Sequence, residues 1–199
     1  MKRRILTATL LAALSLIAFA RAEVTQRHNL RVSLDGHLAP RALPRSKEAP
    51  VSVSLNGQIS TTNGSPLPRL KALRIEINRG GRLEGPGLPV CPMGLIAVAS
   101  SDRALAACRG ALVGDGRFSA NIVLRGQAPY PTTGRLLVFN GRKAGKPALF
   151  GHIYASRPFA TSFVITFKIT HRTHGTYGTV LSASLPEAWA TGDTSPGSR

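Results

Sequence analysis

Strict alternation of apolar and polar side chains is the sequence feature that most restricts the fold of this chain. The longest example places an apolar side chain at every second position from Phe163 to Ile169. Successive side chains of a β-strand point to opposite faces of a sheet, so this pattern fits a strand with one buried face. A helix would spread the same side chains around its axis, and the pattern therefore indicates β structure.

Other segments show the same alternation or have strand-like composition, and turn-forming residues separate them. Gly, Pro and Asn are the residue types that turns favour. The segment Gly114-Asp115-Gly116 is interpreted as the turn of a hairpin, so turn chemistry accounts for Asp115. We expect strands over 51–56, 70–78, 111–113, 118–124, 135–140, 147–155, 162–171 and 176–185.

One segment, between Gly85 and Arg109, departs from the period of two. Ser100 or Ser101 is a suitable N-cap for a short helix, with Asp102 in its first turn. We therefore expect a short helical excursion near 95–108 in an otherwise all-β, antiparallel, sandwich-like domain, with a barrel as the alternative. Strands without intervening helices do not fit a parallel α/β sheet.

The N-terminus contains the three parts of a secretory signal peptide. A basic start is followed by an apolar run from Ile5 to Phe19, and small residues, Ala20 and Ala22, precede the expected cleavage point after Ala22. The run has about 15 residues, fewer than the roughly 20 that a membrane-spanning helix needs. We expect a secreted protein whose mature chain has no transmembrane segment; an uncleaved anchor helix is the alternative.

Four parts of the chain are expected. They are a signal peptide over 1–22, an extended lead-in over 23–48, a single β domain over 49–188 and a disordered tail over 189–199. The lead-in is polar and contains several prolines, and we expect at most one weak strand in it, at Asn29–Leu34.

Cys91 and Cys108 are the only cysteines. An even number of cysteines in an exported chain indicates a disulfide, and this one closes a loop that contributes roughly 3 kcal/mol in the chain-entropy description. A redox or metal pair needs CxxC-like spacing or nearby ligands, which the sequence lacks. We therefore predict a structural bridge.

The chain is strongly basic. Its formal net charge is +17 and falls to +13 when the signal peptide, which contains four basic and no acidic residues, is removed. Arg outnumbers Lys 20 to 6, as GC-rich codons would produce, and the basic residues form no run of five. We expect weak, salt-sensitive contact with anionic envelope polymers and no specific nucleic-acid binding.

No catalytic or cofactor-binding motif is found. The chain has nine acidic residues, and none forms a close sequence pair of the kind that glycosidases use. A Gly-x-Ser-x-Gly nucleophile elbow is missing, and the Gly-rich segments at 80–81 and 85–87 lack the Lys and Ser/Thr of a phosphate loop. We predict no catalytic residue and no cofactor, so the protein is more simply explained as a non-enzyme.

His171 and His174 are the nearest approach to a metal-binding pair. They lie where a strand is expected to end, and His152 would be a third ligand if its strand is adjacent. Two ligands do not complete a zinc site, which needs three or four. We therefore predict no metal site and interpret the pair as turn histidines.

Several segments resemble a family of uncharacterised secreted actinobacterial proteins with no established activity. The resemblance covers 44–187, and it implies an architecture but no site residues. The segments that carry it are Ala49-Pro50-Val51, Leu88-Pro89-Val90-Cys91-Pro92, Cys108 to Gly114, Val138-Phe139-Asn140-Gly141 (interpreted as containing a turn) and Gly175 to Leu181.

The C-terminus departs from that family. Its members continue beyond the segment that corresponds to 185–188, whereas this chain becomes polar and loses its alternation from Trp189 onward. Our hypothesis is that 189–199 is a frameshifted tail and that the domain is truncated; an ordinary disordered terminus is the alternative. The test is to translate the downstream gene sequence in the other reading frame. If that translation contains no segments that alternate apolar and polar residues, the hypothesis is wrong.

Taken together, these features predict an exported, non-catalytic β domain with a structural or adhesive role. Two alternatives stay open. One is a secreted hydrolase or carbohydrate-active domain whose site is assembled from distant loops. The other is an electrostatic binder of anionic envelope polymers.

Overall fold

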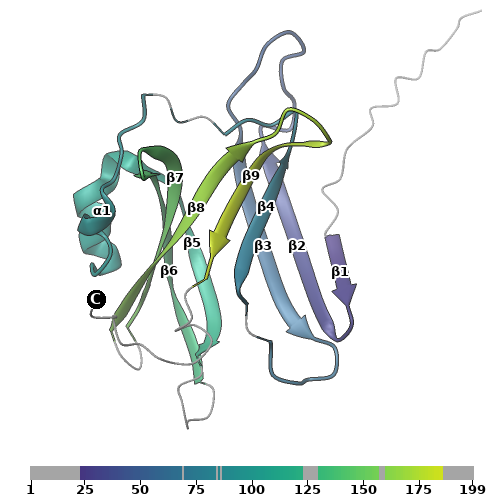
Figure 1. The fold of residues 1–199 in the computed structure, drawn as a ribbon, viewed down its shortest axis with the longest axis vertical. Coiled ribbons are helices and arrows are strands. Elements are labelled where there is room, and N and C mark those ends of the chain that lie inside the picture. Colours follow the sequence, from purple (N-terminus) through teal and green to yellow (C-terminus); the bar gives the residue numbers. More distant parts are fainter. Residues whose placement is uncertain are drawn as a thin grey trace, which may run out of the picture. The chain divides into compact units, whose positions relative to one another are not determined.

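The computed structural model describes residues 23–68, 70–83, 85, 87–122, 130–156 and 160–185. These residues form nine strands, one α-helix and two short 3-10 helices (Figure 1). The chain divides into two compact units, Met1–Pro68 and Arg69–Arg199, and each unit is described separately below. The expected signal peptide and the expected tail lie outside the described residues.

The first unit contains a three-stranded antiparallel sheet of β1 (Glu23–Arg27), β2 (Leu30–Ala39) and β3 (Ser52–Thr61), in the order β1-β2-β3. Leu38 pairs with Val53 and Val32 with Ile59, so apolar side chains of β2 and β3 share one face. The sheet is therefore amphipathic.

The lead-in is more structured than the sequence indicated. It holds two strands instead of at most one weak strand, and the longer of them runs to Ala39. The unit boundary at Pro68 also places β3 with these strands, whereas the expected main domain began at residue 49 and included this segment. Ten residues of β2 pair with β3, and the local sequence of the lead-in does not indicate this pairing because β3 lies further along the chain.

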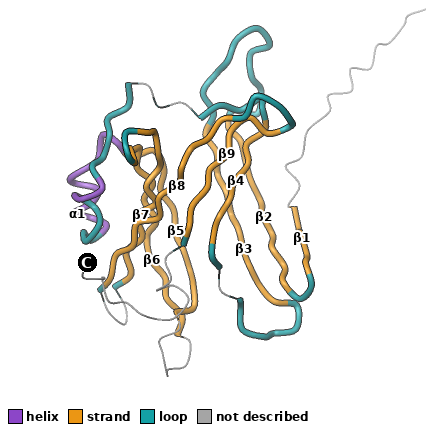
Figure 2. The backbone as a smooth tube through the Cα atoms, viewed as in Figure 1, coloured by secondary structure: helices purple, strands orange, loops and turns teal. Residues whose placement is uncertain are grey.

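The second unit contains a six-stranded antiparallel sheet in the order β4-β9-β8-β7-β6-β5 (Figure 2). Strands β5 to β9 are neighbours in sequence order, and β4 joins the far edge by pairing with β9. The strands are β4 (Ala72–Asn78), β5 (Leu112–Ile122), β6 (Tyr130–Lys143), β7 (Lys146–Ala155), β8 (Thr161–His171) and β9 (Tyr177–Ser184).

Both faces of this sheet carry apolar clusters. On one face, the helical segment packs over Leu137 and Phe139 of β6 and Phe150 of β7, all three fully buried. On the other face, Ile153 and Ile165 pack with aromatic side chains of β5 and β8. The segment comprises η1 (Met93–Leu95), α1 (Ser101–Cys108) and η2 (Arg109–Ala111).

The all-β, antiparallel fold and the short helix are confirmed. Ser100 is the N-cap of α1, and its side chain accepts a hydrogen bond from the Arg103 backbone N–H at 3.4 Å. Asp102 lies in the first turn, where a carboxylate interacts favourably with the helix dipole. Among the described residues, no helix is both long and apolar enough to cross a membrane.

The hairpin expected at Gly114-Asp115-Gly116 is wrong. These residues lie inside the continuous strand β5, where Asp115 pairs with Leu137 of β6. Neither glycine has the positive φ that a tight hairpin turn of this kind needs. Instead of a turn, the pairing of β5 with β6 contains a register shift of the β-bulge kind between Leu112 and Gly114.

The turn expected around Phe139-Asn140-Gly141 is also wrong. Asn140 and Gly141 pair with Leu149 and Ala148 in the middle of the β6–β7 ladder. The chain reverses at Ala144 and Gly145, whose φ values of 49° and 76° are both positive, as in a type I′ turn.

Candidate functional site

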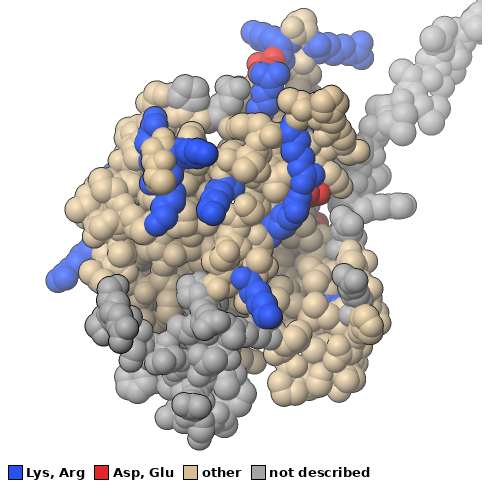
Figure 3. Space-filling view, in the orientation of Figure 1, with Lys and Arg blue, Asp and Glu red and all other residues tan. Residues whose placement is uncertain are grey.

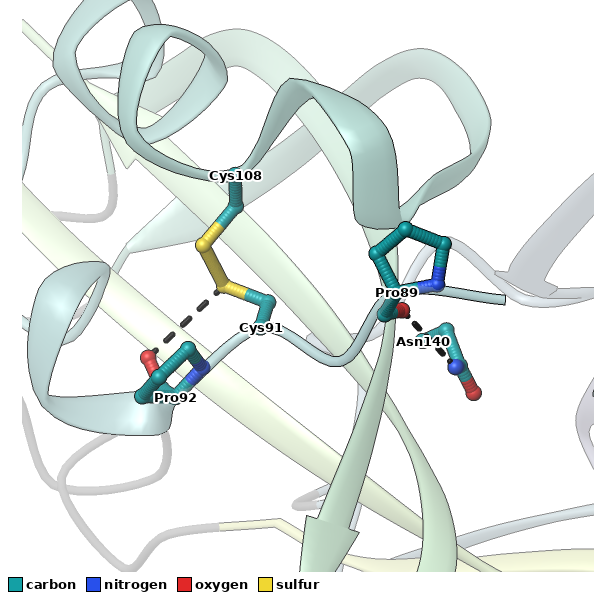
Figure 4. The surroundings of a disulfide bond; sticks show 5 residues. All are labelled: Pro89, Cys91, Pro92, Cys108 and Asn140. Atoms are coloured by element: carbon teal, nitrogen blue, oxygen red, sulfur yellow. Dashed lines mark hydrogen bonds between the residues drawn. A yellow bond between two sulfur atoms is a disulfide. The ribbon is translucent and has the colours of Figure 1, made fainter. Parts of the chain in front are cut away.

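The Cys91–Cys108 disulfide is confirmed and joins the start of the helical segment to the end of α1 (Figure 4). The Cα atoms are 5.4 Å apart, and both residues are buried in the cluster that covers β6 and β7. Such burial is typical of a structural bridge, because a reactive thiol pair needs access to its partner.

Asn140 fastens the chain next to this bridge, as Figure 4 shows. Its side-chain amide donates hydrogen bonds to the carbonyl oxygens of Leu88 at 3.3 Å and Pro89 at 3.0 Å. Its own backbone carbonyl accepts from the Cys91 N–H at 2.9 Å. Asn140, a buried residue of β6, therefore attaches the segment that precedes the disulfide to the sheet. The sequence pattern indicated a turn at Asn140 and did not predict this role.

The histidines that the sequence brought together as candidate ligands do not converge. His152 pairs with Val164 of β8 and shares its face, whereas His171 is an odd number of residues further along β8 and lies on the opposite face. His171 contacts Thr179 and His174 contacts Thr173 through their Nδ1 atoms. The described residues contain no group of three or more His, Cys, Asp or Glu able to hold a metal.

His152 is instead a buried core residue. Its side chain is 0% exposed, and Nε2 lies 2.9 Å from the carbonyl oxygen of Ala99. Burial lowers the pKa of His152 below its ordinary value, and the hydrogen bond to Ala99 opposes this shift. The imidazole is therefore neutral at neutral pH.

One histidine–carboxylate pair occurs in the first unit. His37 Nε2 lies 3.9 Å from Asp35 Oδ2 on the same face of β2, and Ser54 of β3 pairs with His37. The side chains of His37 and Asp35 are 68% and 45% exposed. A general base in a hydrolase is normally held within hydrogen-bond reach in a site that excludes water, and this exposed, longer contact does not provide that arrangement.

A cluster of basic side chains crosses three strands of the second unit. Arg74 of β4 pairs with Ser182 of β9, which pairs with Lys168 of β8, so all three side chains share one face. Arg172 joins them through Glu76, whose Oε1 lies 2.7 Å from Arg74 Nη2 and 3.3 Å from Arg172 Nη1. We call Arg74, Lys168 and Arg172 the basic patch.

The basic patch is open to solvent and carries excess positive charge. The Arg74 and Arg172 side chains are 54% and 45% exposed, and Lys168 is exposed as well. Glu76 balances only one of the three cations. Figure 3 shows that Lys and Arg side chains outnumber Asp and Glu over the region where β4, β8 and β9 lie in Figure 1.

Arg79 has a different role from the basic patch. Its guanidinium donates hydrogen bonds to the Gly175 carbonyl at 2.7 and 3.0 Å and to the Thr173 carbonyl at 2.9 Å. These bonds tie the end of β4 to the turn between β8 and β9. Its donors therefore serve the fold and are not directed at a ligand.

The second unit is thus a disulfide-containing antiparallel β sheet with a basic patch on one uncovered part of its surface. Comparison with known proteins finds no matching family model, no curated relative and no similar solved structure.

Proposed function

We propose that this chain is an exported, non-catalytic adhesive domain that binds anionic polymers of the cell envelope through the basic patch. The observation that carries the proposal is the register that aligns Arg74, Ser182 and Lys168 across three neighbouring strands. Residues that are scattered singly in the sequence thereby form one cationic surface.

The chemistry of the basic patch suits phosphate or carboxylate groups along a polymer. Guanidinium groups can bind such anions through two parallel hydrogen bonds, and the Lys168 ammonium adds a point charge. Neighbouring strands are about 4.8 Å apart, so Arg74 and Lys168 are separated by roughly 10 Å at the backbone. An extended polyanion can therefore contact both residues at once.

Each contact is expected to be weak on its own, because the side chains are exposed and salt screens them. Several weak contacts along one polymer raise the overall affinity, since binding at the first site holds the next group nearby. This combination supports reversible adhesion and requires no enclosed pocket.

Export is supported by the signal-peptide pattern and by the buried disulfide, because disulfides persist in oxidising compartments. When the full chain is expressed with its own N-terminus, we expect processing after Ala22. The intact mass of the mature product should then correspond to a chain that begins at Glu23. A product that retains residues 1–22 in the membrane fraction would contradict export.

The adhesive role is tested with the double variant R74E/K168E and immobilised poly(glycerol phosphate). A basic residue near an anionic surface contributes about 1 kcal/mol, so losing two predicts at least a roughly thirty-fold loss of affinity at low salt. Surface plasmon resonance at 50 mM and 300 mM NaCl measures this loss. Wild-type binding should weaken strongly at the higher salt concentration.

The matched control is K143E/K146E, which changes the net charge by the same amount. These two exposed lysines lie on either side of the β6–β7 turn and outside the basic patch. We expect this variant to retain affinity within a few-fold of the wild type. Equal losses in both double variants would show that net charge alone, without a site, drives binding.

A further inference from the structure

The helical segment over β6 and β7, residues 91–111, is attached to the sheet by a few polar contacts and one apolar cluster. At its start, the Cys91 N–H donates to the Asn140 carbonyl. In its middle, Ser162 Oγ donates to the Ala97 carbonyl at 2.7 Å, and His152 contacts the Ala99 carbonyl at 2.9 Å. We call this segment the cover.

His152 is the titratable member of these attachments. Because a carbonyl only accepts hydrogen bonds, Nε2 must carry the proton in the contact with Ala99. Nδ1 is then the unprotonated nitrogen of the neutral ring, and it is buried without a partner among the described residues. A second proton would have to enter at Nδ1, where the structure offers it no acceptor.

The surroundings of His152 give a protonated ring little support. His152 lies on the sheet face that carries the apolar cluster formed by β6, β7, β8 and the cover. Several polar or charged residues of the sheet share this face with His152. Tyr154 lies two residues beyond His152 on β7 and pairs with Arg135 of β6. Lys168 lies four residues beyond Val164, the partner of His152 on β8, and α1 contributes Asp102 and Arg103, both exposed to solvent.

We propose that the cover is an acid-released latch, in which protonation of His152 frees the middle of the segment from the sheet while the disulfide holds the two ends of the loop 92–107 together. A buried imidazolium with an unpartnered donor is costly, and lifting the cover admits water to Nδ1. Cys91 stays next to Cys108, so residues 92–107 open as a loop. Opening exposes the buried faces of Leu137, Phe139 and Phe150.

The direction of the pH effect follows from proton linkage. Burial lowers the pKa of His152 in the closed state, so the open state binds the proton more readily. The closed state is fully favoured above the ordinary histidine pKa of about 6.5 and loses stability as the pH falls below that value. The open fraction should rise by up to tenfold for each pH unit until the closed state also takes up the proton.

Hydrogen–deuterium exchange of the mature protein between pH 7.5 and pH 4.5, corrected for intrinsic exchange rates, tests the latch. In the wild type, protection of peptides within 92–107 should fall by up to tenfold per pH unit below about 6.5. Peptides of β4 and β9 should keep their protection, because they lie outside the cover. Variant H152Q keeps a donor for Ala99 but does not titrate, so its protection should stay nearly constant over this range.

The matched control is H174Q, which removes an exposed histidine and should follow the wild-type profile. The same acid-dependent loss of protection in H152Q and the wild type would overturn the proposal. If H152Q does not fold, wild-type NMR decides the question. Titration of the His152 ring together with a shift of the Ala99 amide signal supports the latch, whereas a fixed Ala99 signal throughout the pH range contradicts it.

Discussion

Replacing Gly141 with alanine is expected to lower the free energy of unfolding of the six-stranded sheet by about 3 kcal/mol, near the upper end for overpacking a core. The new Cβ atom would collide with the ring of Phe150, approaching its Cδ2, Cε2 and Cζ atoms. Phe150 is 0% exposed and packs in the cluster under the cover, so a displacement of the ring would disturb the other residues of this cluster. Urea denaturation followed by far-ultraviolet circular dichroism measures the loss.

The control for this prediction is G116A. Gly116 also lies in a strand of this sheet, but a Cβ atom there would meet nothing within 4 Å. We expect a change of less than about 0.5 kcal/mol, as at ordinary surface positions. The double variant G141A/F150L should be less destabilised than the sum of its single variants, because the smaller side chain relieves the collision. Strict additivity would contradict this explanation.

Removing the disulfide is expected to have an effect of similar size. The bridge joins residues 17 positions apart, and closing a loop of this length stabilises a folded chain by about 3 kcal/mol through the entropy of the unfolded state. Variant C91A/C108A should therefore unfold at a clearly lower urea concentration than the oxidised wild type. Loss of protection in hydrogen exchange should be greatest in the cover, since both cysteines lie within it.

Wild-type protein reduced with dithiothreitol serves as the control. The reduced protein keeps both sulfur atoms in the core. The difference in the free energy of unfolding between it and C91A/C108A therefore measures only the packing of these sulfur atoms. We expect the reduced wild type and the variant to unfold at similar urea concentrations. A reduced wild type as stable as the oxidised protein would show that the bridge adds nothing to the stability of the sheet.

Much of the six-stranded sheet was predictable from alternation. The expected bounds of β4, β7, β8 and β9 agree with the structure to within two residues, because each carries a clear period of two or ends at turn residues. The disulfide and the helix after Ser100 were predictable for similarly local reasons. An N-cap and a pair of cysteines need no knowledge of distant partners.

The turns of β5 and β6 were not predictable in the same way. Glycine suits a turn, but it also suits a crowded strand position, and Gly141 is needed for the space that it leaves to Phe150. The real reversal uses Ala144 with a positive φ, which non-glycine residues rarely adopt. Local composition therefore favoured the wrong positions.

The basic patch was beyond the reach of sequence reasoning for another reason. Arg74 and Lys168 are far apart in the chain, and only the pairing of β4 and β8 with β9 brings them onto one face. The same limit applied to the histidines, where His152 and His171 belong to adjacent strands but point to opposite faces. Register decides which side chains meet, and register depends on the whole sheet.

The place of β4 in the sheet has a consequence for how the chain is made. Arg79, just after β4, bonds to Gly175, a residue 96 positions later, whereas β5 to β9 are built from successive neighbours. During vectorial synthesis, β4 emerges early and has no strand to pair with until β9 has followed it. Its apolar residues Leu73, Ile75 and Ile77 therefore stay without their partner strand while the chain from Asn78 to Tyr177, about half of its length, is synthesised, and the nascent chain is most exposed to wrong partners during that interval.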